Sequence, residues 1–458
     1  MKSSVKLTEG SIWKKIVAFA IPLFLGNLFQ QLYNLADSLI VGNFLGKQEL
    51  AAVTSIGSLV FLMVGFFTGT AAGAGVVISK YFGAKDDKGV ERAVHTAIAF
   101  GLACGIIMTV LGYLLTPQIL SWMKTPAEVY TSSKEYLQVY FCGSLALVLY
   151  NVCTGILQAV GDSKYPLFCL IVSSCTNVLL DLLFVGAMGK GVGYAALATT
   201  ISQFLSVVLC FVRLTRTKDV YRLVLKNIRF DGLMLRQILK IGLPSGLQNS
   251  IISIANIFVQ SNINSFGEDA MAGSGAYFKV EGFAFLPITC FAMAATTFIS
   301  QNLGAKEYSR AKKGAVFSVI CSISIAELVG VLIYIFIPQF IHMFAKDVNA
   351  ETLFYGSTHA HVTCLFYFLL AFSHIAAAIL RGAGKSTVPM FVMLGIWCVF
   401  RIGYIAVMTQ FFSQYEAVIS CYPVTWSMST VVFTIYLLKS DWLHNWDRQQ
   451  EKLKKKEN

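Results

Sequence analysis

Two aspartates, Asp37 and Asp181, lie within stretches of sequence that are otherwise apolar. Tyr33 and Asn34 precede Asp37 by four and three residues, which places the three side chains on one face of a helix. Gln30, almost one turn further back, lies on the same face. A charged side chain at the centre of a bilayer costs roughly 2.5 to 3.5 kcal/mol on insertion scales, and such residues usually mark ion pathways. The position of Asp37 therefore needs a functional explanation.

Asp181 has a polar neighbour as well, because Asn177 precedes it by four residues. Amide and hydroxyl groups can form hydrogen bonds with either protonation state of a carboxyl group. Burial favours the protonated form of an acid, and contact with water favours release of the proton. The two acids therefore predict a coupled site that binds a cation in one conformation and releases it in another. The alternative is a pair of hydrogen-bonded acids that only fix helix packing.

A third acid, Glu281, lies in the apolar segment YFKVEGFAFLP. A carboxylate there could attract a cationic substrate, with Phe283 as an aromatic neighbour. The alternative is a structural ion pair with Lys279 or Arg401, and the sequence leaves both open. Glu327 has no close polar companion, which favours a packing role.

The segments that carry these acids are long and apolar. Of the 458 residues 56% are hydrophobic and 13% are charged, and the mean hydropathy is +0.66, so the chain is an integral membrane protein. Stretches of about 20 apolar residues cross a bilayer as helices. We predict an all-α fold with twelve transmembrane helices, at residues 16–45, 50–79, 93–115, 133–158, 165–187, 191–214, 236–266, 271–300, 314–338, 353–380, 388–411 and 416–438.

The basic residues predict how the chain is oriented. Twelve helices with a cytoplasmic N-terminus place most of the 36 lysines and arginines on the cytoplasmic side. This positive-inside distribution predicts that both termini are cytoplasmic, in a multi-pass protein of the cell membrane. It also explains the net charge of +12 without nucleic acid as a partner. The eleven cysteines occur singly in apolar segments, which predicts packing residues without a metal site.

The two halves of the chain repeat each other. VVISKYFGAKD at 76–86 resembles TFISQNLGAKE at 297–307, and ILQAVGDSKYP at 156–166 resembles ILRGAGKSTVP at 379–389. Pro22 matches Pro244 at nearly the same offset. The order of these matches predicts two pseudo-symmetric six-helix bundles of the same topology.

The repeat sets the predicted domain boundaries. We expect an N-lobe at 1–214, a cytoplasmic linker at 215–234, a C-lobe at 235–440 and a charged cytoplasmic tail at 441–458. The linker is rich in arginine and lysine, which is typical of a solvated segment that faces lipid headgroups.

These repeated motifs, with the ADSLIVG run at 36–42, resemble the multidrug and toxic compound extrusion (MATE) family of bacterial transporters over about residues 13 to 438. The resemblance implies two six-helix lobes in a V shape around a cavity that opens alternately to each side. It also implies secondary active efflux of organic cations and amphipathic drugs in exchange for protons or sodium ions.

The resemblance also implies roles for individual residues. The coupling-ion site of similar members corresponds here to Asp37, Asn177, Asp181 and Thr199, with Tyr33 in the same region. Candidate residues of the substrate cavity share polar or aromatic character, and they are Gln30, Asn34, Asn151, Thr154, Glu281 and Phe283.

Several positions depart from the family pattern. Many relatives have proline directly after the fifth-helix acid, whereas Leu182 stands here, so any bend must have another origin. A family asparagine of the fourth helix corresponds to Thr154, with Asn151 one turn earlier. Segment 243–259 contains no acid, and the tenth helix offers His374 instead of one, which disfavours a sodium site in the C-lobe.

Two other function classes compete with an antiporter. A flippase for a lipid-linked or amphipathic metabolite would need cationic side chains for phosphate, and Lys279, Arg381 and Arg401 are the candidates. A membrane-embedded enzyme would need a cluster of acids or metal ligands at one depth, which the sequence lacks. We therefore expect no catalytic residues, no cofactor other than the coupling ion, and a monomer in the lipid bilayer with small-molecule cations as partners.

Overall fold

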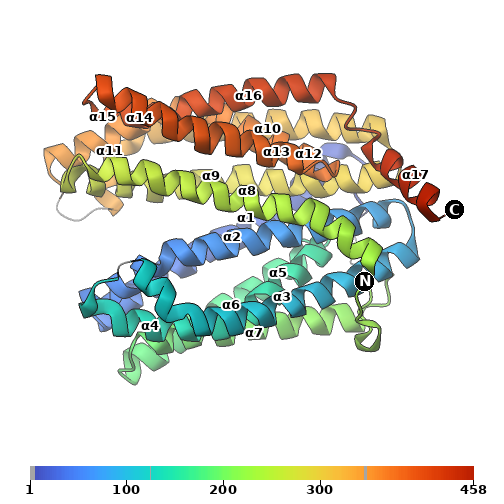
Figure 1. Ribbon diagram of the computed structural model, residues 1–458, viewed down its shortest axis with the longest axis horizontal. Coiled ribbons are helices and arrows are strands. Elements are labelled where there is room, and N and C mark those ends of the chain that lie inside the picture. The colour runs from blue at the N-terminus through green and yellow to red at the C-terminus, as the bar shows by residue number, and fades with distance from the viewer. Residues whose placement is uncertain (1–5, 124, 345–347, 458) are drawn as a thin grey trace. The chain divides into compact units, whose positions relative to one another are not determined.

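The computed structural model describes residues 6–123, 125–344 and 348–457, and within these ranges the chain forms long helices and no β-strand (Figure 1). Residues 1–5 of the predicted N-lobe and residue 458 of the predicted tail lie outside the described part. Ten helices are long and apolar enough to cross a membrane, and the bent pair α4 (Ala127–Cys142) and α5 (Ser144–Ala159) makes an eleventh. The prediction of an all-α membrane protein is confirmed.

Each of the twelve predicted segments corresponds to one helix or to one interrupted helix. The segment that does not meet the apolar criterion is α8 (Gly232–Asn264), which carries seven Asn and Gln side chains besides Arg236 and Lys240. Its length of 33 residues exceeds the roughly 20 residues that span a bilayer. The twelve-helix architecture is therefore consistent with the structure, and α8 is its most polar member.

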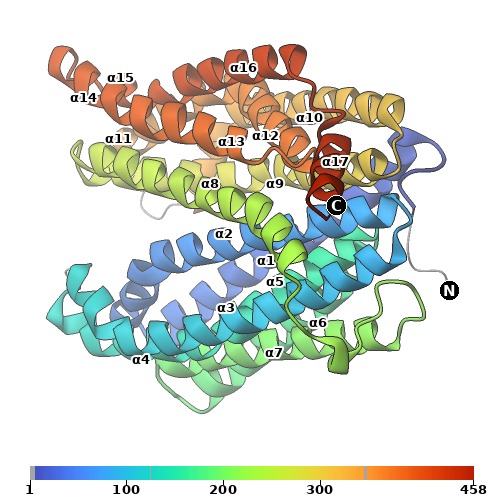
Figure 2. The same cartoon turned by 45° about the vertical axis from the view of Figure 1, so that its right-hand side comes forward.

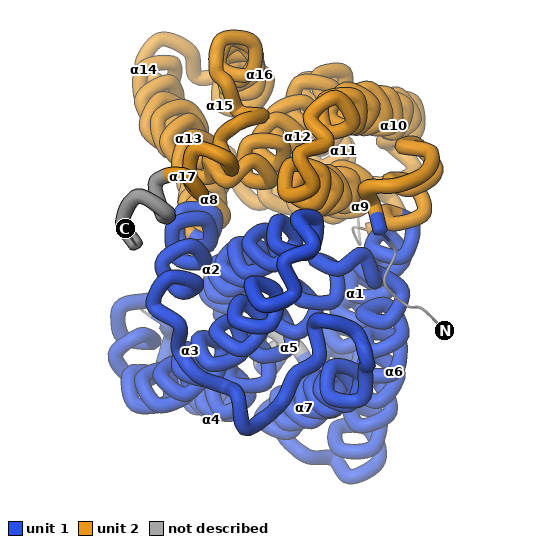
Figure 3. The backbone as a smooth tube through the Cα atoms, turned by 90° about the vertical axis from the view of Figure 1, so that its right-hand side faces the viewer, with its two compact units in different colours: residues 1–6, 21–246 blue, residues 7–20, 247–458 orange. Residues whose placement is uncertain are grey.

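The chain divides into two compact units, shown in blue and orange in Figure 3. Unit 1 contains residues 1–6 and 21–246, and unit 2 contains residues 7–20 and 247–458. This division differs from the predicted lobe boundaries at 214 and 235, because it cuts through α1 (Ile12–Phe44) and α8. Pro22 and Pro244 lie close to the two division points, where the missing N–H of proline interrupts the helix hydrogen bonds.

Unit 1 consists of the remainder of α1, the first part of α8 and the helices between them. Those helices are α2 (Lys47–Gly83), α3 (Asp87–Trp122), α4, α5, α6 (Lys164–Asp181), the π-helix η1 (Leu182–Ala187), α7 (Val192–Arg216) and the short 3₁₀ helix η2 (Leu225–Asn227). α6 and α7 run side by side in both ribbon views (Figures 1 and 2).

Glycines allow α2 and the first part of α8 to approach closely within unit 1. Gly69 and Gly73 are spaced four residues apart on α2, and Gly242 and Gly246 repeat this spacing on α8. A Cβ atom on Gly69 would lie 2.5 Å from the Gly246 backbone nitrogen, and one on Gly73 would overlap the Gly242 backbone. This is the small-residue crossing that membrane helices use to bring their backbones together.

Unit 2 consists of the start of α1, the rest of α8 and the helices that follow. Those are α9 (Glu268–Gly304), α10 (Tyr308–Phe344), α11 (Ala350–Thr363), η3 (Cys364–Phe366), α12 (Tyr367–Gly382), α13 (Thr387–Val392), the π-helix η4 (Met393–Phe400), α14 (Arg401–Phe411), α15 (Tyr415–Ile419), α16 (Cys421–Lys439) and α17 (Asn445–Glu457).

The sequence repeat has a structural counterpart at the ends of α2 and α9. These helices end at Gly83 and Gly304, each within a GAK motif. The lysines of the two motifs, Lys85 and Lys306, both adopt the left-handed conformation, with φ of 56° and 62°. Residues other than glycine rarely adopt this conformation, so the two motifs form the same unusual helix terminus.

In each unit an arginine forms hydrogen bonds with the segment that precedes the first helix of a repeat. That helix is α8 in unit 1 and α1 in unit 2. In unit 1, Arg92 of α3 donates hydrogen bonds to Asp231, directly before α8, with Nη2 at 2.6 Å. In unit 2, Arg310 of α10 donates to the carbonyl oxygens of Leu7, Glu9 and Gly10, directly before α1. The two segments are therefore fixed parts of the units in which they lie.

Candidate functional site

The acids that the sequence singles out meet inside unit 1. Asp37 lies on α1 and is half-buried, and Asp181 is the last residue of α6 and has no exposed surface. Their carboxyl groups interact with each other. Two carboxylates side by side away from water cannot both remain charged without a cation, so at least one proton or metal cation must accompany the pair.

The oxygens around this pair have few partners. Asp37 Oδ1, both carboxyl oxygens of Asp181 and Oδ1 of Asn177 are buried and form no regular hydrogen bond with any described residue. Asn177 Nδ2 donates to Thr199 Oγ1 at 3.3 Å, and Thr199 Oγ1 donates to the Ala195 carbonyl oxygen at 3.2 Å. The amide of Asn177 is thus oriented with its oxygen free to accept. The arrangement leaves four oxygens able to bind a proton or a hard cation.

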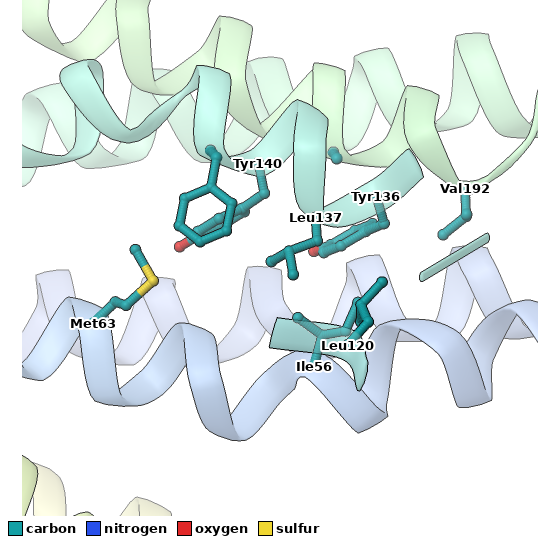
Figure 4. Close-up of a cluster of buried hydrophobic side chains, with 9 residues drawn as sticks. Ile56, Met63, Leu120, Tyr136, Leu137, Tyr140 and Val192 are labelled. Atoms are coloured by element: carbon teal, nitrogen blue, oxygen red, sulfur yellow. The ribbon is translucent and has the colours of Figure 1, made fainter. Parts of the chain in front are cut away.

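Tyrosines surround the acid pair. Tyr33, one turn before Asp37, lies within electrostatic range of both acids. Tyr136 of α4 also lies near both acids and stacks on Tyr140, with ring centroids 6.3 Å apart. Figure 4 shows these two rings in a buried cluster with Ile56, Leu120 and Leu137. Sequence analysis missed Tyr136 and Tyr140, although their spacing of four residues on one helix face was a usable signal.

The other polar candidates of unit 1 form a separate network. Asn151 Oδ1 accepts from Thr68 of α2 at 3.1 Å, and Asn151 Nδ2 donates to the Leu147 carbonyl oxygen at 2.8 Å. Thr154 donates to the Asn151 carbonyl oxygen at 3.0 Å. Gln30 and Asn34 are exposed on α1. The structure therefore groups Asp37, Asp181, Asn177, Thr199 and Tyr33, and it gives Asn151 and Thr154 partners of their own.

The remaining two candidates, Glu281 and Phe283, belong to unit 2. Phe283 is half-buried and stacks on Phe344 of α10, with centroids 6.3 Å apart. Glu281 Oε1 accepts a hydrogen bond from Tyr277 at 3.3 Å. Of the two cations considered as its partner, Lys279 is exposed, whereas Arg401 is 1% exposed and interacts electrostatically with Glu281. The structural partner of Glu281 is thus Arg401, across a gap wider than a direct ion pair.

Arg401 has a well-built environment in unit 2. Its Nη1 donates to Asn256 at 3.2 Å, and its Nη2 donates to Thr425 at 2.8 Å. The guanidinium lies over the rings of Trp397 and Tyr422, at 5.3 and 4.8 Å from their centroids. Hydrogen bonds and cation–π contacts together stabilise this buried charge.

Two further ionisable groups of unit 2 have local partners. Glu327 Oε2 accepts from the Phe368 backbone N–H at 3.2 Å, in agreement with a packing role. His374 lies between the rings of Phe285 and Trp397, at centroid distances of 4.8 and 5.6 Å. Glu327 thus has a hydrogen-bond partner in its own unit, whereas His374 has only ring contacts there and its Nε2 is buried without a hydrogen bond to the described residues.

A π-helix adjoins the key charge in each unit. In unit 1, η1 begins at Leu182, directly after Asp181, at the position where many relatives have proline. In unit 2, η4 ends at Phe400, directly before Arg401. The π-helix shifts the helical register without proline, and such segments are frequent at functional sites. It gives the helix an irregularity at Leu182 that does not depend on proline.

An all-helical membrane protein with an internal repeat and a pair of acids within one unit is typical of a membrane transporter. The MatE family profile matches residues 22–183 and 244–407, one stretch in each half of the chain. The chain belongs to this family, whose members are transporters and not enzymes. It is a multi-pass membrane protein.

Related sequences agree with this assignment, and a solved structure has the same fold. The chain is 29% identical over 400 residues to a probable multidrug resistance protein, YoeA, of Bacillus subtilis, and covers 86% of each chain. It is 25% identical to the probable multidrug resistance protein NorM of Thermotoga maritima over 88% of this chain and 86% of the relative. A crystal structure of MATE in complex with MaL6 matches at a TM-score of 0.88 and 24% identity, over 95% of this chain and 98% of the other.

Proposed function

We propose that the protein exports amphipathic organic cations from the cell and takes up protons in exchange, with Asp37 and Asp181 as the proton-binding pair. The observation that carries this proposal is the pair itself: two adjoining acids in unit 1 whose buried oxygens lack regular hydrogen-bond partners among the described residues. The relatives that are multidrug resistance proteins support the class of cargo.

The chemistry follows from the environment of the pair. A cation bound there neutralises like charges that otherwise repel each other in a medium of low polarity. When the site opens to water, both carboxylates are solvated and the cation can leave. Alternating access couples this event to the cargo if the two conformations solvate the pair differently.

Sodium competes with protons as the coupling ion. A sodium ion prefers oxygen ligands, and the pair with Asn177 offers four buried oxygens. Protonation needs only one of these atoms and no fixed geometry, whereas a sodium ion needs several of them directed toward one point. We therefore favour the proton, and sodium is the alternative outcome of the test.

The test is uptake of a fluorescent organic cation into proteoliposomes that contain the purified protein. A pH gradient is imposed first and a sodium gradient second, for wild type and for Asp37→Asn. We expect the pH gradient alone to drive transport in wild type, and the variant to match empty liposomes while it remains folded by size-exclusion chromatography. Uptake that only sodium drives would reassign the coupling ion.

Failure of both gradients to move any organic cation would refute drug export and favour a flippase of amphipathic metabolites. Normal transport by Asp37→Asn would make Asp37 a packing residue. Thr176→Val is a suitable control, because Thr176 lies on α6 one residue before Asn177 and donates only to the Val172 carbonyl oxygen at 2.8 Å. This variant should transport as wild type does.

A further inference from the structure

Unit 2 contains a chain of hydroxyl groups that ends at Glu281. Tyr277 donates to Glu281 Oε1 at 3.3 Å, and its hydroxyl lies 2.6 Å from Thr363 Oγ1 and 2.8 Å from the hydroxyl of Tyr367. Thr363 Oγ1 also donates to the His359 carbonyl oxygen at 2.8 Å. The chain joins α9, α11 and α12, and Tyr277, Tyr367 and Thr363 are almost fully buried.

The direction of the hydrogen bonds in this chain depends on Glu281. A tyrosine hydroxyl has one proton to donate and two lone pairs to accept with. When Glu281 is ionised, Tyr277 donates to it and accepts from its other neighbours. When Glu281 is protonated, its own proton can be donated to Tyr277, which then donates to Tyr367 or Thr363. The network satisfies either state by rotating hydroxyl groups, without moving a helix.

A site that changes charge needs a counter-charge as well as adaptable hydrogen bonds, and Arg401 provides the counter-charge. An ionised carboxylate in the membrane interior needs a counter-charge, and Arg401 interacts electrostatically with Glu281 without contacting it as an ion pair. Arg401 itself is held by Asn256, Thr425 and two aromatic rings. It therefore keeps its position and hydrogen bonds when Glu281 is neutral. A direct ion pair would instead lock Glu281 in the charged state.

The other titratable groups near Glu281 come from the neighbouring helices. Tyr367 lies on α12, Cys364 on η3 and Tyr422 on α16, and each interacts electrostatically with Glu281. On α11, His359 stacks on the ring of Tyr277 at 4.4 Å and contacts the hydroxyl of Tyr415 through Nδ1 at 3.1 Å. None of these groups carries a permanent charge as Arg401 does. Glu281 is therefore the acid that can gain or lose a proton beside the fixed charge of Arg401.

We propose that Glu281 is a second proton carrier of the transport cycle, located in unit 2, with Tyr277 as its hydrogen-bond donor and Arg401 as its fixed counter-charge. This inference rests on the proposed proton-coupled export and extends it to a further residue. One proton binds Glu281 when unit 2 admits water from outside, and the same proton leaves to the cytoplasm later in the cycle. The cycle then moves more protons than the acid pair of unit 1 carries.

The experiment measures how many protons move with each cargo molecule. Proteoliposomes have their membrane potential held at zero with potassium and valinomycin and carry a pH gradient of about one unit. Tetraphenylphosphonium is the cargo, and its gradient is varied until net flux stops. Because each coupled proton contributes about tenfold to the balancing gradient per pH unit, we expect Glu281→Gln to balance at a gradient about tenfold smaller than wild type.

Glu327→Gln is the matched control, since Glu327 is another membrane acid of unit 2 whose partner is a backbone N–H. It should balance at the wild-type gradient. Glu281→Asp retains a carboxyl group and should also balance there, although at a lower rate. Should Glu281→Gln fail to fold, the double variant Glu281→Gln with Arg401→Met removes both charges and carries the same tenfold expectation.

A balancing gradient equal to wild type in either neutral variant would overturn the proposal. This outcome leaves the proposed function intact, because wild type would still show proton-driven transport in the same experiment. Absence of proton-driven transport in wild type would instead refute the proposed function itself. The two failures are therefore distinguishable.

Discussion

Each unit has an ionisable residue beside a π-helix on the fifth helix of its repeat. The two residues differ in how many partners the surrounding chain gives them. In unit 1, Asp181 precedes η1 and has two carboxyl oxygens without regular hydrogen-bond partners among the described residues. In unit 2, Arg401 follows η4 and has two hydrogen bonds and two aromatic faces. Both halves have a π-helix within the fifth helix, after the charge in unit 1 and before it in unit 2, and they differ in what that helix presents.

The comparison separates a site that needs a ligand from a site that stabilises the fold. Buried polar groups are normally paired, so the unpaired oxygens at Asp181 and Asp37 support the proposed cation site. Arg401 has partners within the chain at both Nη atoms and against two aromatic rings, whereas its Nε is buried without a hydrogen bond to the described residues. The acid pair lowers the stability of the fold and can bind a cation, whereas Arg401 contributes to stability.

The largest effect should come from Asp181→Asn. Transport should fall to the level of empty liposomes, while the unfolding temperature in detergent stays equal to wild type or rises, because an amide relieves repulsion between two acids. Cation uptake and thermal unfolding monitored by tryptophan fluorescence would test this on the same preparation. A substantial loss of stability would contradict the comparison, since Asp181 would then hold the fold together.

Arg401→Met should have the opposite effect on stability from Asp181→Asn, because Arg401 is a charge that stabilises the fold. Removal of one charge from a buried pair destabilises proteins by about 3 kcal/mol, because the remaining charge is left uncompensated. We expect a loss of this size in the free energy of unfolding, measured by SDS titration in mixed micelles. Addition of Glu281→Gln should restore part of it. If the double variant is no more stable than the single one, Arg401 and Glu281 are not coupled.

The smallest effect concerns Asp231, which lies before α8 and outside the membrane-spanning segments. Burial favours its neutral form, but hydrogen bonds from the Met234 backbone, from Arg92 and from the Leu233 backbone outweigh burial and hold the pKa of the carboxyl below its usual range. A carboxyl whose pKa is lower in the folded state stabilises the fold above its unfolded pKa. This contribution is lost as the pH falls through the folded pKa.

Asp231→Asn should therefore lower the unfolding temperature slightly at pH 7, and the difference from wild type should shrink as the pH falls below about 4. Asp219→Asn, in the same linker, is the control and should show a smaller difference at pH 7. A difference that grows on acidification would show that Asp231 does not hold the entry of α8 through its charge. Arg310 in unit 2 binds carbonyl oxygens instead, so that unit should lack this dependence.

Much of this arrangement could be predicted from the sequence. Helix existence followed from apolar length, and the repeat followed from the GAK motifs, whose lysines share one unusual conformation. The grouping of Asp37, Asp181, Asn177 and Thr199 followed from helical spacing and from family resemblance, and the structure brings the four together. Their part in ion coupling stays a prediction.

Other features depend on contacts between distant residues and leave little local signal. Tyr277, Tyr367 and Thr363 form one hydroxyl network across 90 residues of chain, and each is an ordinary core residue when read alone. The π-helices η1 and η4 arise in apolar runs with no marker such as proline. The division of α1 and α8 between the units differs from the repeat boundaries because sequence repeats report ancestry, whereas compact units report contacts.

That division sets an order for folding during synthesis. Unit 1 includes residues up to 246, among them the glycines of α8 that cross α2, so it stays unfinished until the ribosome has passed the end of the first repeat. Unit 2 needs residues 7–20, which were made at the start. Neither repeat is thus a complete folding unit when cut at the linker. Two halves expressed as separate polypeptides should assemble only if both are present in the same membrane.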